Sequence, residues 1–136
     1  EGNRLAVSDG PGTVRLLNLK SGRVRWTHHA GRDTSLSGTP PGVRAWGPTL
    51  LVAVSRNHGV ELDRLDPATG RSAWNGDAAF LDAAAVSLEN ADADDVRVYV
   101  PVGRLLTAVC LKDGKSAWEA ELPDTRGAGG WIVRAG

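Results

Sequence analysis

The sequence predicts an all-β fold of about three four-stranded antiparallel sheets. Three segments align without gaps, and each has a glycine four residues before a tryptophan: LLNLKSGRVRW (16–26), RLDPATGRSAW (64–74) and AVCLKDGKSAW (108–118). The three glycines are separated by 48 and 44 residues. Apolar, β-branched runs precede each glycine, and no long stretch has the 3.6-residue periodicity of a helix. A period in the forties with this pattern is typical of the blades of a β-propeller, so we expect a partial propeller.

The expected strands follow the repeats in order. The first repeat (about residues 1–30) gives strands at 5–8, 13–19 and 23–27; the second (42–78) at 43–46, 49–55, 60–65 and 71–75; the third (83–122) at 84–88, 96–102, 105–111 and 115–120. Turn-forming residues separate the strands. The segment 131–135 repeats the Val-Arg-Ala of residues 43–45, so residues 130–136 are expected to open a further blade or to close the first. All 136 residues then form one domain.

The residues shared by the repeats are expected to be structural. This set is Gly22, Trp26, Asp66, Gly70, Trp74, Gly114 and Trp118. The glycines supply the positive φ of a tight turn, and Asp66 bonds the backbone amides of its own turn, as Asn18 does in the first repeat. In the third repeat Cys110 stands at that position, and Asp113 is the expected substitute. Each tryptophan is expected to pack one blade against the next, which buries roughly 150–250 Å².

Composition and charge exclude several classes of protein. The 16 basic and 16 acidic residues balance, so no net field would draw the protein to nucleic acid or to an anionic membrane. Cys110 is the one cysteine, which excludes an internal disulfide and leaves no set of ligands at zinc spacing. No stretch approaches the roughly 20 apolar residues of a membrane span. Because the sequence has no methionine, we expect the chain to be a piece of a longer protein.

The most acidic run, residues 89–95, contains the candidate metal ligands. Asp92, Asp94 and Asp95 have carboxylate oxygens that Ca²⁺ accepts, but the run lacks the third spaced ligand, the glycine and the closing glutamate of a calcium loop. The favoured interpretation is a solvated hairpin loop, inserted where the second repeat has only residues 47–48. We therefore expect no metal there, although insertions in loops often carry binding.

Other polar groups are expected to have ordinary roles. Adjacent residues of a strand point to opposite faces, so His28 and His29 would not chelate one ion together with Asp33 or His58. Residues 127–130 (GAGG) precede no helix that would aim amides at an anion, so they are expected to be a connector. No Gly-x-Ser-x-Gly element orders serine, histidine and aspartate for nucleophilic attack. The sequence predicts no catalytic and no cofactor-binding residue.

The best-preserved repeat resembles the pyrroloquinoline-quinone (PQQ) repeat, in which an apolar strand precedes Leu-Asp-x-x-Thr-Gly and a short strand ending in tryptophan. LDPATGRSAW (65–74) matches this pattern closely, and residues 17–26 and 109–118 match it more loosely. The resemblance covers about residues 5–135 and implies a propeller, normally of about seven or eight blades, docked by tryptophans. The family includes quinoprotein dehydrogenases and also non-catalytic propellers resembling the outer-membrane assembly lipoprotein of Gram-negative bacteria.

The enzymes of this family are marked by a vicinal cysteine pair beside the quinone, by Ca²⁺ ligands and by a catalytic aspartate. A single cysteine excludes the pair, and no motif here matches the calcium ligands. The sequence therefore favours a protein that is not an enzyme, and neither PQQ nor calcium is expected in this segment.

We expect a bacterial, non-catalytic scaffold that binds a protein partner, a ligand or the remaining blades of its parent through loops at one end of the blades. Two alternatives stay open: a piece of a quinoprotein dehydrogenase whose catalytic residues, PQQ and calcium lie elsewhere, and a ligand-sensing propeller ectodomain. The open blade edges are expected to self-associate, as an open arc or as a dimer completing a six-bladed ring. The resemblance also implies an extracytoplasmic or periplasmic location.

Overall fold

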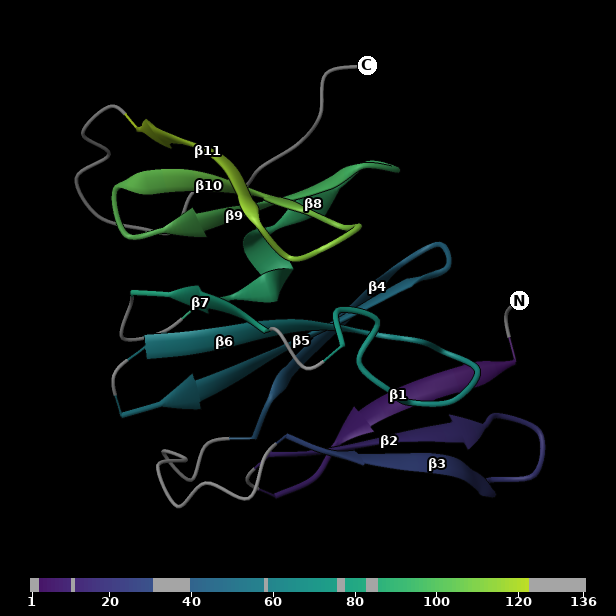
Figure 1. Cartoon of the computed structure of the whole chain (residues 1–136). Coiled ribbons are helices and arrows are strands. Elements are labelled where there is room, and N and C mark those ends of the chain that lie inside the picture. The colour runs from purple at the N-terminus through teal and green to yellow at the C-terminus, as the bar shows by residue number, and fades with distance from the viewer. Residues whose placement is uncertain are drawn as a thin grey trace.

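The computed structural model describes residues 3–10, 12–30, 40–57, 59–75, 78–82 and 86–122. These residues form three antiparallel sheets, which confirms the all-β prediction. Each sheet corresponds to one repeat, and we call it a blade. The three blades stack one above another in chain order, with blade 2 in the middle (Figure 1).

Within each blade the strands lie side by side in sequence order. Blade 1 has three strands: β1 (Arg4–Ser8), β2 (Thr13–Asn18) and β3 (Val24–His29). Blade 2 has four: β4 (Gly42–Trp46), β5 (Thr49–Arg56), β6 (Gly59–Leu65) and β7 (Ala79–Leu81). Blade 3 has four: β8 (Asp92–Ala93), β9 (Arg97–Val102), β10 (Leu105–Cys110) and β11 (Ser116–Glu121). A 3₁₀ helix, η1 (Leu88–Asn90), precedes β8.

The core lies between the blades, in two layers. The layer between blades 1 and 2 contains the buried residues Val14, Leu50, Val52, Val54 and Leu65. The layer between blades 2 and 3 includes Leu51, Leu62, Trp74, Val98 and Val109. Successive residues of a strand point to opposite faces, so β5 sends alternate side chains into the two layers. Blade 2 is therefore covered on both faces by the other two blades.

The outer strand of blade 2 differs from the prediction of a strand at 71–75. Ser72 makes an isolated bridge to Leu65, the chain turns at residues 73–75, and pairing with β6 resumes only at β7. The cause is local: Ser72 Oγ donates to Asp63 Oδ1 at 2.8 Å and accepts a bond from the Trp74 amide at 3.2 Å, and Asn75 takes a φ of 57°. These side-chain bonds compete with the ladder of a continuous strand.

The inner strand of blade 3 was also predicted at the wrong place. Leu88 starts η1 and does not end a strand, and residues 83–85 lie outside the described ranges. The strand is β8, inside the acidic run, where Ala91 and Ala93 are buried and pack in the core. The run is therefore not an inserted solvated loop, because it holds the inner strand itself. Small alanines that alternate with aspartates have the composition of a loop, although here the alanines are buried.

Several expectations concern residues outside the described ranges: the strand at 131–135, the connector at 127–130, and the side chains of Asp33 and His58. In the part of the chain that is described, no helix has the length and apolar character needed to span a membrane.

Candidate functional site

The turn that carries the repeat motif has the same backbone geometry in all three blades. We call residues 18–22, 66–70 and 110–114 the repeat turns. In each of them the glycine amide bonds the carbonyl four residues earlier, at 2.8 Å for Gly22, 2.8 Å for Gly70 and 2.9 Å for Gly114. In blade 2, Asp66 Oδ1 accepts the Ala68 amide at 2.8 Å. The three turns thus share one backbone geometry, and the side chain of Asp66 shapes the turn of blade 2.

In the third repeat turn, an aspartate makes the side-chain hydrogen bond that a serine and a threonine make in the first two turns. Ser21, Thr69 and Asp113 each stand just before the glycine, and each side-chain oxygen accepts the amide two residues further on, at 3.4, 3.3 and 3.0 Å respectively. Asp113 therefore takes the place of Ser21 and Thr69. Asp113 was suggested as a substitute for Asn18 and Asp66; it does bond an amide of its own turn, but from the position of Ser21 and Thr69.

Two tryptophans bind the repeat turn of the following blade. Trp26 Nε1 donates to the carbonyl of Pro67 at 3.0 Å, and Trp74 Nε1 donates to the carbonyl of Leu111 at 2.8 Å. Both acceptors lie three residues before the turn glycine. The Trp26 ring also lies against Gly70, where an added Cβ would come within 2.6 Å of ring atoms. Each tryptophan thus joins two blades by packing and by one hydrogen bond.

The acidic run contributes structure to blade 3. Asp94 Oδ1 accepts the amides of Val96 and Arg97 at 2.8 and 2.7 Å, and its Oδ2 accepts the Tyr99 hydroxyl at 2.7 Å. This hydrogen bond from the hydroxyl to the carboxylate raises the pKa of Tyr99. Asp92 Oδ1 accepts the amide of Ala93 at 2.8 Å. Asp92 and Asp94 are therefore engaged in shaping the hairpin.

Asp95, the third candidate ligand, is exposed next to that hairpin. Across the described ranges, no group of three or more histidine, cysteine, aspartate or glutamate side chains is close enough to hold a metal ion.

A polar cluster that the sequence did not predict lies between blades 1 and 2. Ser72 donates to Asp63, and burial raises the pKa of Asp63, while that hydrogen bond and the charge of His28 lower it in part. His28 Nδ1 donates to the carbonyl of Gly70 at 3.0 Å. Serine, histidine and aspartate thus meet here, but the serine bonds the carboxylate directly, so the histidine is not placed as its base.

The two histidines do point in different directions, as strand geometry requires. His28 faces blade 2, whereas His29 Nδ1 lies 3.4 Å from Thr13 Oγ1 of its own blade. The nearby Arg56 donates to Glu61 Oε2 at 2.8 Å. Arg56 also donates to the carbonyl of Ala30 at 3.4 Å, so this contact and that of His28 with Gly70 join blades 1 and 2 through polar groups.

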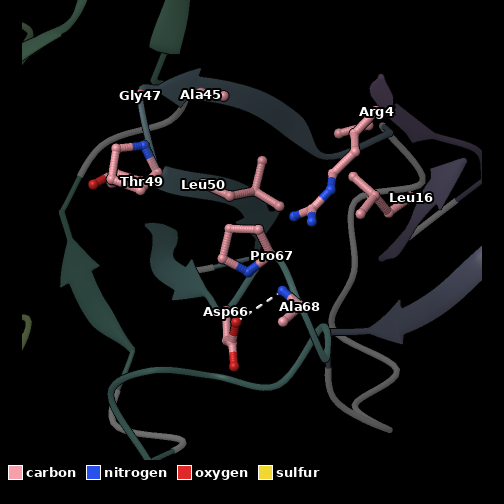
Figure 2. Close-up of a pocket in the computed structure, with 11 residues that line it drawn as sticks. Arg4, Leu16, Ala45, Gly47, Thr49, Leu50, Asp66, Pro67 and Ala68 are labelled. Carbon is pink, nitrogen blue, oxygen red and sulfur yellow. Dashed lines mark hydrogen bonds between the residues drawn. The ribbon is translucent and has the colours of Figure 1, made fainter. Parts of the chain in front are cut away.

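An open pocket lies between blades 1 and 2 on the side of the repeat turns. It has a volume of about 550 Å³ and is lined by Leu16, Leu50 and Pro67, with Asp66 at its edge. Figure 2 shows Arg4 of β1 extending toward Leu50 and Pro67. Asp66 is already bonded to its own turn, through Ala68 and the Thr69 hydroxyl. We call this the inter-blade pocket; its walls are largely aliphatic, and Arg4 and Asp66 are its charged residues.

No pattern in the sequence predicts this pocket. Its lining comes from β1, β2, the β4–β5 hairpin and the repeat turn of blade 2, which are distant in the chain. Only the stacking of two blades brings these segments together.

A family model described as outer membrane protein assembly factor BamB matches residues 1–134. The chain belongs to this family. Its PQQ-like repeats account for the repeat turns and for the tryptophans that join the blades. A comparison with the sequences of curated proteins gives no match.

Solved structures show the same fold. BamB from Moraxella catarrhalis matches with a TM-score of 0.63 and 20% identity, over 94% of this chain and 37% of that one. The computationally designed Ika8 protein matches with a TM-score of 0.66 and 9% identity, over 90% and 35%. A quinohemoprotein alcohol dehydrogenase, ADHIIG from Pseudomonas putida HK5, matches with a TM-score of 0.63 and 13% identity, over 88% and 25%.

These likenesses establish the fold as β-propeller blades. The chain spans little more than a third of the length of the BamB structure and a quarter of the dehydrogenase.

Proposed function

We propose that this chain is part of a non-catalytic propeller scaffold that binds other proteins. The observation that carries the proposal is the use of the motif residues: Asp66 and Gly70 form a turn, and Trp74 joins two blades. The carboxylates of the acidic run likewise bond backbone amides and a tyrosine. These groups therefore serve the framework of the blades, which supports a scaffold role.

The inter-blade pocket is the surface that we assign to a partner. Leu16, Leu50 and Pro67 offer aliphatic contact, and Arg4 places a cation beside them. Such a surface suits a partner segment that pairs an apolar side chain with a carboxylate. The matched family is described by a role in outer membrane protein assembly, which supports an extracytoplasmic site of action for the parent protein.

Adding PQQ and Ca²⁺ tests the non-catalytic part of the proposal. We expect neither dye-linked dehydrogenase activity nor a rise in melting temperature, because a ligand that binds the folded state would stabilise it. A PQQ-dependent dehydrogenase assayed in parallel is the positive control. Activity, or a rise in melting temperature that needs both PQQ and Ca²⁺, would favour a piece of a quinoprotein dehydrogenase and would overturn the scaffold assignment.

A further inference from the structure

A second pocket lies between blades 1 and 2, at the opposite end of their interface from the inter-blade pocket. The inter-blade pocket lies at the start of β5, beside Thr49 and Leu50, whereas this one lies at the end of β5, beside Arg56. Its volume of about 390 Å³ is within the range of small-ligand sites, roughly 300–1,000 Å³. We call it the polar pocket; its polar lining includes His28, Arg56, Glu61, Asp63 and Ser72.

Arg56 is a buried cation whose hydrogen-bonding capacity is only partly used. Its side chain is 10% exposed, and its Nη2 donates to Glu61 Oε2 at 2.8 Å and to the carbonyl of Ala30 at 3.4 Å. Its Nε and Nη1 are buried and have no hydrogen-bond partner in the described part of the chain. A buried N–H of a charged group that lacks an acceptor costs free energy. The polar pocket therefore contains donors that a ligand with acceptor oxygens would satisfy.

Two carboxylates enter the same pocket from β6. Glu61 and Asp63 are two residues apart on this strand, so they point to the same face and are separated by about 7 Å. Asp63 accepts the Ser72 hydroxyl, but no lysine or arginine within the described ranges forms an ion pair with it. The charge of His28 lowers the pKa of Asp63 in part, but burial outweighs it. Asp63 is thus a half-buried acceptor that a cation would stabilise.

This pair of carboxylates is specific to blade 2. Asp63 and Glu61 stand three and five residues before Asp66, the first residue of the repeat turn. The equivalent positions before the other two repeat turns carry Arg15 and Thr13 in blade 1, and Thr107 and Leu105 in blade 3. Blades 1 and 3 form the same hairpin and the same turn without a carboxylate at either position. The blade fold therefore does not require the pair, which indicates a role particular to blade 2.

The outer edge of blade 2 is interrupted beside this pocket. In blade 3, β11 pairs with β10 along residues 105–109. In blade 2, the outer segment pairs with β6 at Ser72 and again from Ala79, and Asp63 has no cross-strand partner on this side among the described residues. Ser72 and Ala78, on either side of the interruption, both line the pocket. The local departure from the repeat thus coincides with the polar pocket.

The remaining lining and the charges together define a matching ligand. Val52, Val54 and Ala78 form aliphatic walls, and the two valines are buried. An anion alone would be repelled by Glu61 and Asp63, and a cation alone would leave Arg56 unsatisfied. A matching ligand combines an anionic acceptor, a cationic donor and a small aliphatic group.

From these observations we propose that the polar pocket binds a free α-amino acid with a small aliphatic side chain. The carboxylate of the ligand accepts the unpaired N–H groups of Arg56, its ammonium group donates to Asp63, and its side chain packs on Val52 and Val54. Charge-assisted hydrogen bonds of this kind are stronger than neutral ones. The site is separate from the inter-blade pocket that we assign to a protein partner, so each proposal can be tested without the other.

Isothermal titration calorimetry of the 136-residue chain with L-valine tests the proposal, and we expect saturable binding to one site. Two analogues with the same carbon skeleton separate the two charged groups of the ligand. Isovalerate lacks the amine, and L-valinamide has a neutral amide in place of the carboxylate. Each should bind at least about tenfold more weakly than L-valine, because each loses charge-assisted hydrogen bonds to the pocket.

Two substitutions locate the binding in the polar pocket. Asp63→Asn and Arg56→Gln should each weaken the binding of L-valine by about tenfold or more. Asp63→Asn should also remove most of the preference for L-valine over isovalerate, which a general loss of structure would not do. Arg104→Gln is the matched control, because Arg104 is an exposed arginine that pairs with Glu121 at the surface. Circular dichroism checks that each variant is folded.

Several results would overturn the proposal. Absence of saturable binding at millimolar L-valine would mean that solvent satisfies Arg56. Isovalerate bound as tightly as L-valine would exclude recognition of the amine, and L-valinamide bound as tightly would show that the pocket takes the amino terminus of a peptide. Binding that Asp63→Asn leaves unchanged, or that Arg104→Gln weakens equally, would place the ligand elsewhere. If Arg56→Gln does not fold, Asp63→Asn decides, because asparagine keeps the shape of the side chain.

Discussion

Trp74 and Trp118 occupy the same position in consecutive repeats, but their surroundings differ. Trp74 is 3% exposed and bonds the carbonyl of Leu111 in blade 3. Trp118 is 39% exposed, because no described blade follows it. The repeat motif therefore specifies that a tryptophan is presented, whereas the neighbouring blade determines how much that tryptophan stabilises the fold.

The two glycines that accept such tryptophans show the same difference. Gly70 has a φ of 74° and the ring of Trp26 against it, whereas Gly22 has a φ of 66° and open space. Both glycines adopt the left-handed backbone conformation, but only Gly70 must also leave space for a tryptophan ring. Matched substitutions at Gly70 and Gly22 can therefore compare a packed repeat turn with an open one.

The largest expected effect is that of Trp74→Ala. Removing a buried aromatic side chain should lower the free energy of unfolding by about 3–5 kcal/mol, because a cavity is left and a hydrogen bond is lost. Urea denaturation at a protein concentration that keeps the chain monomeric measures it. Trp118→Ala under the same conditions is the control, with a loss of about 1 kcal/mol from the contact with Tyr99. Equal losses would contradict the comparison.

A smaller effect is expected at the glycines. Gly22→Ala should cost about 1–2 kcal/mol in the free energy of unfolding, the penalty for placing a side chain in the left-handed region. Gly70→Ala should cost more, because its Cβ would also displace Trp26. The measurement is again denaturation of the monomer, and the difference between the two variants isolates the contact with the tryptophan. A cost at Gly22 as large as that at Gly70 would show that the face of blade 1 is already covered.

The sequence predicted the hairpins well, and physical reasons explain where it failed. Strands such as β5 and β10 are apolar runs bounded by turn residues, and both signals are local. The strand β8 was missed because it has two residues and lies among aspartates, so its character depends on the burial of Ala91 and Ala93 by blade 2. The outer edge of blade 2 was missed because the bonds of Ser72 redirect the chain.

The candidate site was less predictable than the fold. The motif identified the turns and the tryptophans, since these recur at one spacing. The inter-blade pocket and the cluster of His28, Asp63 and Ser72 join residues that are far apart in the chain and on different blades. No sequence periodicity predicts these contacts, because they depend on how one sheet stacks on the next.

The smallest expected effect concerns the polar contact between blades 1 and 2. Burial raises the pKa of Asp63 in the folded state, so protonation of this carboxyl favours folding. Its contribution to stability is complete below the ordinary aspartate pKa and is lost as the pH rises through the raised value. Asp63→Asn should therefore be at least as stable as the natural chain at pH 7, by less than about 1 kcal/mol because the half-buried carboxyl is partly screened by solvent.

Melting temperatures of the two proteins from pH 3 to pH 7 measure this effect. The advantage of Asp63→Asn should shrink toward zero as the pH falls below the ordinary aspartate pKa, where Asp63 is neutral in both states. Asp95→Asn, at an exposed carboxylate, is the control and should show no such trend. If Asp63→Asn were instead less stable at pH 7 and equal at low pH, the charge of Asp63 would be stabilising through His28, and the polar side of this interface would be held by an ion pair.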